Sequence, residues 1–176
     1  MKDHILMLLI LLCLILGCQT ERESITQSPG RTWGQPSNGL RCSIALEKTR
    51  WSKGDPIPVS VLVENVSESR VDLKTIPAFI LNEMQYWCPV DIVGENHTLP
   101  ANARSIISLQ PGTTTNSIVD ISKLGWDRGI SSIWPAQDLY SLVPPGFYKL
   151  RLDIEIVDGD NPGWIHSNEI KITIAE

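Results

Sequence analysis

The stretch that decides the fold is YKLRLDIEI, residues 148–156, in which apolar and charged side chains alternate without a break. The apolar positions are Tyr148, Leu150, Leu152, Ile154 and Ile156. The charged positions between them are Lys149, Arg151, Asp153 and Glu155. A period of two is the pattern of a β-strand with one side in a core and the other in water. We therefore expect the four charged side chains to form solvated surface.

The same alternation recurs along most of the chain after residue 39. It is found near residues 42–46, 59–63, 71–74, 88–92 and 170–174, with weaker candidates at 104–109 and 116–121. Turn-forming residues separate these segments, as in Gln110-Pro111-Gly112. Many short strands of this kind favour an antiparallel β-sandwich. The sequence thus predicts one all-β domain of about seven to eight strands over residues 39–176, with one short helical turn within 132–141.

The segment that leads into the deciding strand resembles a known structural motif. Residues 142–148, LVPPGFY, look like the tyrosine corner of immunoglobulin-like sandwiches, in which the hydroxyl of a tyrosine, here Tyr148, binds nearby main chain. The layout also resembles bacterial immunoglobulin-like domains of the intracellular proteinase inhibitor type. The matching features are VLVEN at 61–65, Pro111-Gly112 and the Pro-Gly-x-Tyr run at 145–148. This resemblance implies the fold, and no stretch matches an inhibitory loop, so inhibition stays a minor hypothesis.

The N-terminal residues have the pattern of an export signal, and we expect them to act as one. Lys2 precedes an apolar run from Ile5 to Leu16, which is shorter than the roughly 20 residues that a membrane-spanning helix needs. The run ends in LILGC at 14–18, which resembles the lipobox of bacterial lipoproteins. That resemblance implies removal of residues 1–17, acylation of Cys18, and a place in the bacterial cell envelope, at the outer membrane if the cell is Gram-negative. Residues 18–38 are polar, and we predict a flexible tether there.

Charge and motif content exclude several classes of function. Lys plus Arg is 15 and Asp plus Glu is 20, so the net charge of −5 argues against nucleic-acid binding. The sequence lacks HExxH, CxxC and GxSxG motifs, so we expect no enzyme, no metal and no cofactor. The loop that starts at Asp158 partly fits a calcium-loop pattern, but Pro162 stands where an oxygen ligand belongs. A polar hairpin loop explains this segment more simply.

Cys42 and Cys88 are the cysteines that remain after Cys13 is removed and Cys18 is acylated. Both fall on the apolar sides of their strands. Disulfides persist in exported proteins, so we predict a bond between them, worth roughly 3–4 kcal/mol. The alternative is a pair of buried thiols that never meet.

Tryptophan is enriched, with six Trp against two Phe. Several of these indoles lie beside turns, where they could close the ends of a core or contact a partner. If an aromatic cluster is functional, we expect it at Trp126 and Trp134, in the longest irregular stretch. The sequence therefore predicts a monomeric, non-enzymatic module that binds another envelope protein and is held at the membrane through Cys18. The alternatives are a carbohydrate-binding sandwich that uses exposed Trp and a proteinase-inhibitor-like domain.

Overall fold

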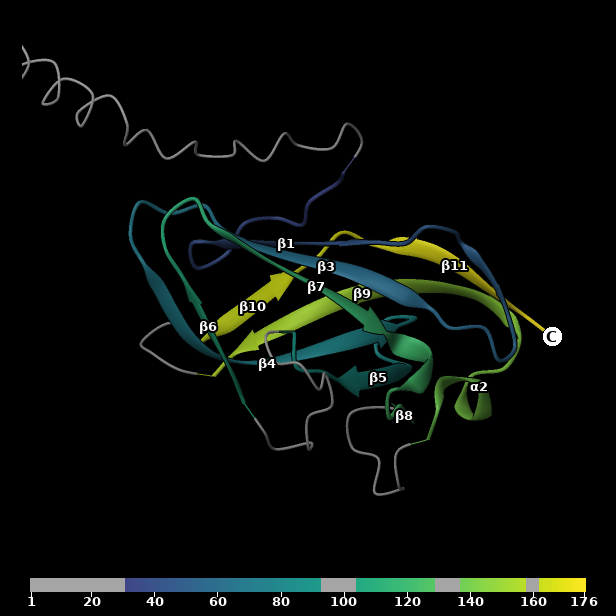
Figure 1. Cartoon of the computed structure of the whole chain (residues 1–176). Coiled ribbons are helices and arrows are strands. Elements are labelled where there is room, and N and C mark those ends of the chain that lie inside the picture. The colour runs from purple at the N-terminus through teal and green to yellow at the C-terminus, as the bar shows by residue number, and fades with distance from the viewer. Residues whose placement is uncertain (1–30, 93–103, 129–136, 158–161) are drawn as a thin grey trace, which may run out of the picture. The chain divides into compact units, whose positions relative to one another are not determined.

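The computed structural model describes residues 31–92, 104–128, 137–157 and 162–176, and the strands in these ranges form two sheets (Figure 1). The strands are β1 (Leu40–Ala45), β2 (Arg50–Ser52), β3 (Pro58–Asn65), β4 (Val71–Leu81), β5 (Tyr86–Pro89), β6 (Ser105–Leu109), β7 (Thr114–Asp120), β8 (Asp127–Arg128), β9 (Gly146–Ile156), β10 (Gly163–His166) and β11 (Ile170–Ala175). Two short helical turns are η1 (Ile121–Lys123) and α2 (Leu139–Leu142). Within the described ranges, no helix has the length and apolar character needed to cross a membrane.

The smaller sheet has the order β1-β3-β7 and is antiparallel throughout. The larger sheet has the order β2-β11-β9-β4-β5-β8, with β10 added to β9 and β6 added to β4. Its strands are antiparallel except where β2 runs parallel to β11. The prediction of an all-β immunoglobulin-like sandwich is confirmed.

The described residues contain eleven strands, more than the seven or eight that alternation suggests. The two long central strands explain the excess. On one side, β4 pairs first with β6 and then with β5. In the same way, β9 pairs first with β11 and then with β10. One side of each long strand is therefore shared by two short strands, and this raises the number of strands.

The core lies between the two sheets and follows the alternation of the strands. In β3 the inward side chains Val59, Val61 and Val63 are almost fully buried. In β9 the apolar side chains of residues 148–156 are buried in the same way. Burial of this apolar surface is the main term that stabilises the domain.

The tyrosine corner predicted from residues 142–148 is present. The Tyr148 hydroxyl donates a hydrogen bond of 2.6 Å to the carbonyl oxygen of Pro144. Its ring lies edge-on to Tyr86, with centroids 6.3 Å apart. The contact fixes the loop that enters β9 against the strand itself.

Residues 31–38 do not continue the predicted flexible tether. The Gly34 N–H donates to the carbonyl of Cys42 at 2.8 Å. The Ser43 hydroxyl donates to the carbonyl of Thr32 at 2.6 Å, and Arg31 reaches Ser43 and Ser60. These residues bind the outer side of β1, because an edge strand offers unpaired main-chain groups. The compact unit therefore begins at Arg31 rather than at residue 39.

Candidate functional site

Trp126, the first of the two predicted binding residues, is fully buried. Its indole Nε1 donates to the carbonyl of Ile121 at 2.8 Å, and its main chain pairs with Gln137. The indole therefore closes part of the core, and the prediction that Trp126 contacts a partner is wrong. Trp134 and the predicted lipidation site Cys18 lie outside the described residues.

The predicted disulfide is absent, because Cys42 and Cys88 are both free and buried. Cys42 lies on β1, which contacts β9 and β10, whereas Cys88 lies on β5, two strands from β9 across the large sheet. Two strand spacings amount to about 10 Å, beyond the roughly 7 Å between Cα atoms that a disulfide tolerates. Burial raises the pKa of Cys42 to about 12 and also raises that of Cys88. Both thiols therefore act as small apolar core residues.

A cluster of charged side chains lies on the outer face of the large sheet, where β9 pairs with β10. Asp153 is only 2% exposed. Arg151 binds both of its oxygens: Nε lies 2.6 Å from Oδ1, and Nη2 donates to Oδ2 at 2.8 Å. His166 stands opposite Asp153 in the β9–β10 register, with Nδ1 2.8 Å from the same Oδ1. One buried carboxylate thus fixes an arginine and a histidine at once.

An exposed aromatic side chain extends this cluster. Trp164 lies two residues before His166 on β10, so both side chains point to the same face of the sheet. Their rings are parallel, with an interplanar angle of 4° and centroids 6.3 Å apart. Trp164 is 43% exposed, and the side chain of His166 is half exposed. We call Arg151, Asp153, Trp164 and His166 the β9–β10 cluster.

The β9–β10 cluster corrects the expectation that all four charged positions of the deciding strand are solvated. Asp153 is buried because its neighbours cover it from both sides, and only a paired carboxylate tolerates such burial. The contact holds His166 in one orientation and directs Nδ1 to the carboxylate, so Nε2 is the ring nitrogen left for a ligand. The cluster therefore presents Trp, His and Arg side chains in fixed positions at the surface.

The described residues contain no group of three or more His, Cys, Asp or Glu side chains placed to hold a metal ion. The first four residues of the segment that partly fits a calcium loop, including Asp158 and Asp160, lie outside the described residues.

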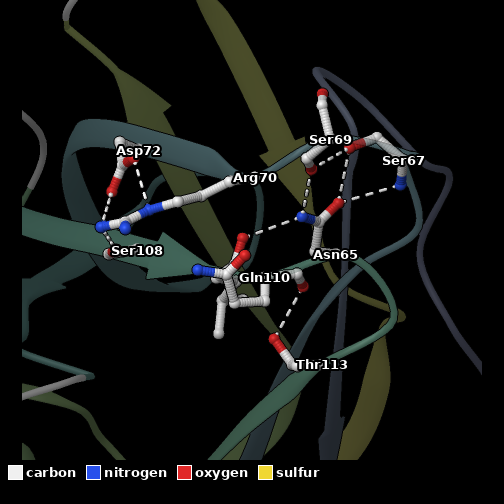
Figure 2. Close-up of polar contacts among 9 residues, drawn as sticks. Asn65, Ser67, Ser69, Arg70, Asp72, Ser108, Gln110 and Thr113 are labelled. Atoms are coloured by element: carbon white, nitrogen blue, oxygen red, sulfur yellow. Dashed lines mark hydrogen bonds and ion pairs between the residues drawn. The ribbon is translucent and has the colours of Figure 1, made fainter.

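A second polar cluster joins the β3–β4 loop to the turn between β6 and β7 (Figure 2). The side chain of Asn65 is fully buried at its centre. Its Nδ2 donates to the carbonyls of Ser69 and Leu109 at 2.8 and 2.9 Å. Its Oδ1 accepts from the N–H and the hydroxyl of Ser67 at 2.9 and 2.7 Å. All four hydrogen-bonding positions of the amide are used inside the protein, so Asn65 is a structural residue.

A groove of about 640 Å³ lies at one end of the sandwich, lined by Lys53, Arg128, residues 140–145 and residues 174–176. The hydroxyl of Tyr140 donates to the carbonyl of Asp55 at 2.6 Å, and burial raises its pKa to about 12. This polar group is therefore used to attach α2 to the β2–β3 loop rather than to receive a ligand.

Alternation in the sequence places Asp153 among the outward charges of its strand, but it gives no link to His166, which lies 13 residues later. The signal that could have joined them is the hairpin between β9 and β10. A turn that places Gly163 opposite Ile156 also places His166 opposite Asp153 and Trp164 opposite Glu155. Register of this kind follows once both strand ends of a hairpin are known.

No protein-family model and no curated protein matches the sequence. Among solved structures, the chain is similar to the alkylpurine DNA glycosylase AlkC of Pseudomonas fluorescens, with 10% identity and a TM-score of 0.37 over 77% of this chain and 30% of that one. It is also similar to a β-glucosidase of Listeria innocua, with 11% identity and a TM-score of 0.37 over 78% of this chain and 16% of that one. A β-glucosidase of Erythrobacter marinus gives 15% identity and a TM-score of 0.34 over 77% and 15%. The chain spans less than a third of the length of each of these proteins, and similarities this distant carry no argument about function.

Proposed function

We propose that this protein is a lipid-anchored component of the bacterial cell envelope whose sandwich binds another protein through the β9–β10 cluster. The support for the anchor is the sequence LILGC at 14–18, with Cys18 as the acylated residue. The support for the binding surface is the exposed Trp164 stacked on His166 next to Arg151. That arrangement is the observation that carries the proposal.

The chemistry of the cluster favours a protein partner. Trp and Arg are the residues that contribute most to protein interfaces, and they do so best when they are held in place before binding. Asp153 provides this order, because its carboxylate binds Arg151 and His166 below the surface. A mixed patch of aromatic, cationic and hydrogen-bonding groups suits the varied surface of a protein.

Carbohydrate binding is the second candidate, and the exposed indole of Trp164 favours it, because sugars stack on aromatic faces. One face of this indole is already turned toward His166, which leaves a single face for a sugar. A protein partner can use the indole edge together with the side chains of Arg151 and His166, so it remains the first proposal.

The test is cross-linking in intact cells that produce the full-length protein, followed by mass spectrometry of the captured proteins. We expect one reproducible envelope partner, whose capture falls at least about tenfold in Trp164→Ala. Phe147→Ala is the matched control, because Phe147 is an 85% exposed aromatic side chain of β9 outside the cluster. A partner captured equally by both variants would show that the surface lies elsewhere. Glycan-array binding that Trp164→Ala abolishes, without any protein partner, would favour the carbohydrate alternative.

A further inference from the structure

The groove of about 640 Å³ lies at the end of the sandwich that carries α2 and the C-terminal end of β11 (Figure 1). Its volume falls within the range of sites that hold small molecules, roughly 300–1,000 Å³. No residue of the β9–β10 cluster lines it. The groove is therefore a separate place on the molecule from the proposed protein-binding surface.

The walls of the groove are largely apolar and are fixed by hydrogen bonds. The apolar lining residues are Leu142, Val143, Pro144, Pro145 and Ile174. The carbonyl of Pro144 accepts from the Tyr148 hydroxyl at 2.6 Å, which holds the loop before β9. The Tyr140 hydroxyl donates to the carbonyl of Asp55 at 2.6 Å, which holds α2. The walls are thus in place before a ligand binds, so binding need not order them.

Two cationic side chains, Lys53 and Arg128, line the same groove from separate segments of the chain. The N–H of Lys53 donates to the carbonyl of Ala175 at 3.1 Å, which places this residue beside the end of β11. Arg128 pairs with Tyr86 across β5 and β8, and its guanidinium carbon lies 5.7 Å from the centre of the Tyr86 ring. Within the described ranges neither side chain forms an ion pair, although Glu176 lines the same groove. Both cations therefore retain hydrogen-bond donors for an anionic group.

We propose that this groove binds a single-chain aliphatic carboxylate, with the carboxylate held by Lys53 and Arg128 and the chain along the apolar walls. Each part of the lining matches one part of this ligand. The guanidinium of Arg128 fits a carboxylate through two parallel hydrogen bonds, and the ammonium of Lys53 adds a second positive charge. The aliphatic chain removes apolar wall surface from water. An aliphatic cation would be repelled by the same two side chains, and a neutral sugar would match neither the charge nor the apolar walls.

The test uses membranes isolated from cells that produce the full-length protein, and a decanoic acid that carries a photo-reactive diazirine as the probe. We expect light to attach the probe to residues 140–145 or 174–176, where mass spectrometry of peptides locates it. Excess decanoate should prevent this labelling. Acetate, which lacks the chain, and decyltrimethylammonium, which carries the opposite charge, should not prevent it.

Variants of the cations test the part of the ligand that carries charge. Lys53→Glu reverses one of the two charges, and we expect it to lower the labelling at least about tenfold. Lys53→Arg keeps the charge and should keep the labelling. Lys171→Glu is the matched control, because Lys171 is an exposed cation of β11 that does not line the groove.

Arg128→Gln provides a second variant, and it should lower the labelling in the same way. Absence of the probe from the groove would overturn the proposal. Labelling that decyltrimethylammonium displaces as well as decanoate does, or that Lys53→Glu leaves unchanged, would show that charge takes no part and would overturn it too. The groove shares no residue with the β9–β10 cluster, so this result does not depend on the capture of a protein partner.

Discussion

The side-chain amide of Asn168 binds both the main-chain N–H and the main-chain carbonyl of Ile44. The Ile44 N–H donates to Oδ1 at 2.8 Å, and Nδ2 donates to the Ile44 carbonyl at 3.0 Å. Asn168 belongs to the loop between β10 and β11 of the large sheet, whereas Ile44 belongs to β1 of the small sheet. One amide therefore imitates a strand residue and joins the edges of the two sheets, because it supplies a donor and an acceptor in the same plane.

Replacing Asn168 by alanine should destabilise the domain by about 1–3 kcal/mol, since it leaves the N–H and the carbonyl of Ile44 without partners. Urea unfolding followed by tryptophan fluorescence measures this loss. Gln110→Ala is the matched control, because it removes an amide of an exposed residue and should change the free energy of unfolding by less than about 0.5 kcal/mol. Equal effects of the two variants would contradict the role given to Asn168.

Tyr148→Phe removes only the hydroxyl that donates to the Pro144 carbonyl at 2.6 Å. The ring and its contact with Tyr86 remain, so the change isolates the tyrosine corner. We expect a loss of about 0.5–1.5 kcal/mol in the free energy of unfolding. A Tyr140→Phe variant, which loses the bond to the Asp55 carbonyl, allows comparison with a similar hydroxyl outside β9. No change in Tyr148→Phe would mean that packing alone fixes the corner.

Within the β9–β10 cluster, we expect the loss of Arg151 to destabilise the protein more than the loss of Asp153. Arg151→Ala leaves the buried carboxylate of Asp153 with only His166 beside it, and should cost about 3 kcal/mol or more. Asp153→Ala leaves Arg151 and His166, which are both partly exposed and can be hydrated, and should cost less. The double variant should cost less than the sum of the two, because they remove one interaction. Additive urea-unfolding values would contradict the coupling.

Because Cys42 and Cys88 are free, a reducing agent should leave the melting temperature unchanged. Alkylation should modify these two thiols only after unfolding, because both are buried and burial raises their pKa values. Mass spectrometry of the alkylated full-length protein, before and after urea, measures the difference. A melting temperature that falls on reduction would reveal a disulfide and contradict the structure.

The carboxyl of Asp120 makes the stability of the domain depend on pH in the acid range. Burial alone would raise the pKa of its carboxyl, but hydrogen bonds from Ser122, from the Ile57 N–H and from Lys123 lower it below the ordinary value. A carboxyl with a lowered pKa stabilises the fold above its unfolded pKa of about 3.9, and this contribution is lost as pH falls through the folded value. Asp120→Asn should therefore flatten the decrease in stability below about pH 4. An unchanged acid-unfolding profile in this variant would contradict the assignment.

The fold was predictable because strand alternation is a local property. Alternating apolar residues indicate which side of a strand is buried, as they do at 148–156 and at the valines of residues 59–63. The pattern arises because a sheet with one face in the core buries apolar side chains on that face and exposes polar ones on the other. The tyrosine corner was predictable for the same reason, because Pro144 and Tyr148 lie only four residues apart. The short strands β2 and β8 were not predictable, because so few residues cannot show an alternation of apolar and polar side chains.

The candidate site was only half predictable. Trp126 lies beside a turn, as an exposed anchor would, but its Nε1 finds the carbonyl of Ile121 and the indole turns into the core. Asp153 looks like a surface charge in the sequence, yet the cross-strand position of His166 and the side chain of Arg151 bury it. Both outcomes depend on neighbours that only folding brings together.

The sequence by itself therefore determined the sandwich, the buried side of each main strand and the tyrosine corner, because each depends on residues close together in the chain. The tertiary structure decided that Cys42 and Cys88 stay apart, that Asp153 joins Arg151 and His166, and that the outer side of β1 is bound by Gly34 and Asn168. These features depend on strand order and register across two sheets. Residues such as Ile44 and Asn168, which meet across more than a hundred positions of sequence, become partners only when the sheets close on each other.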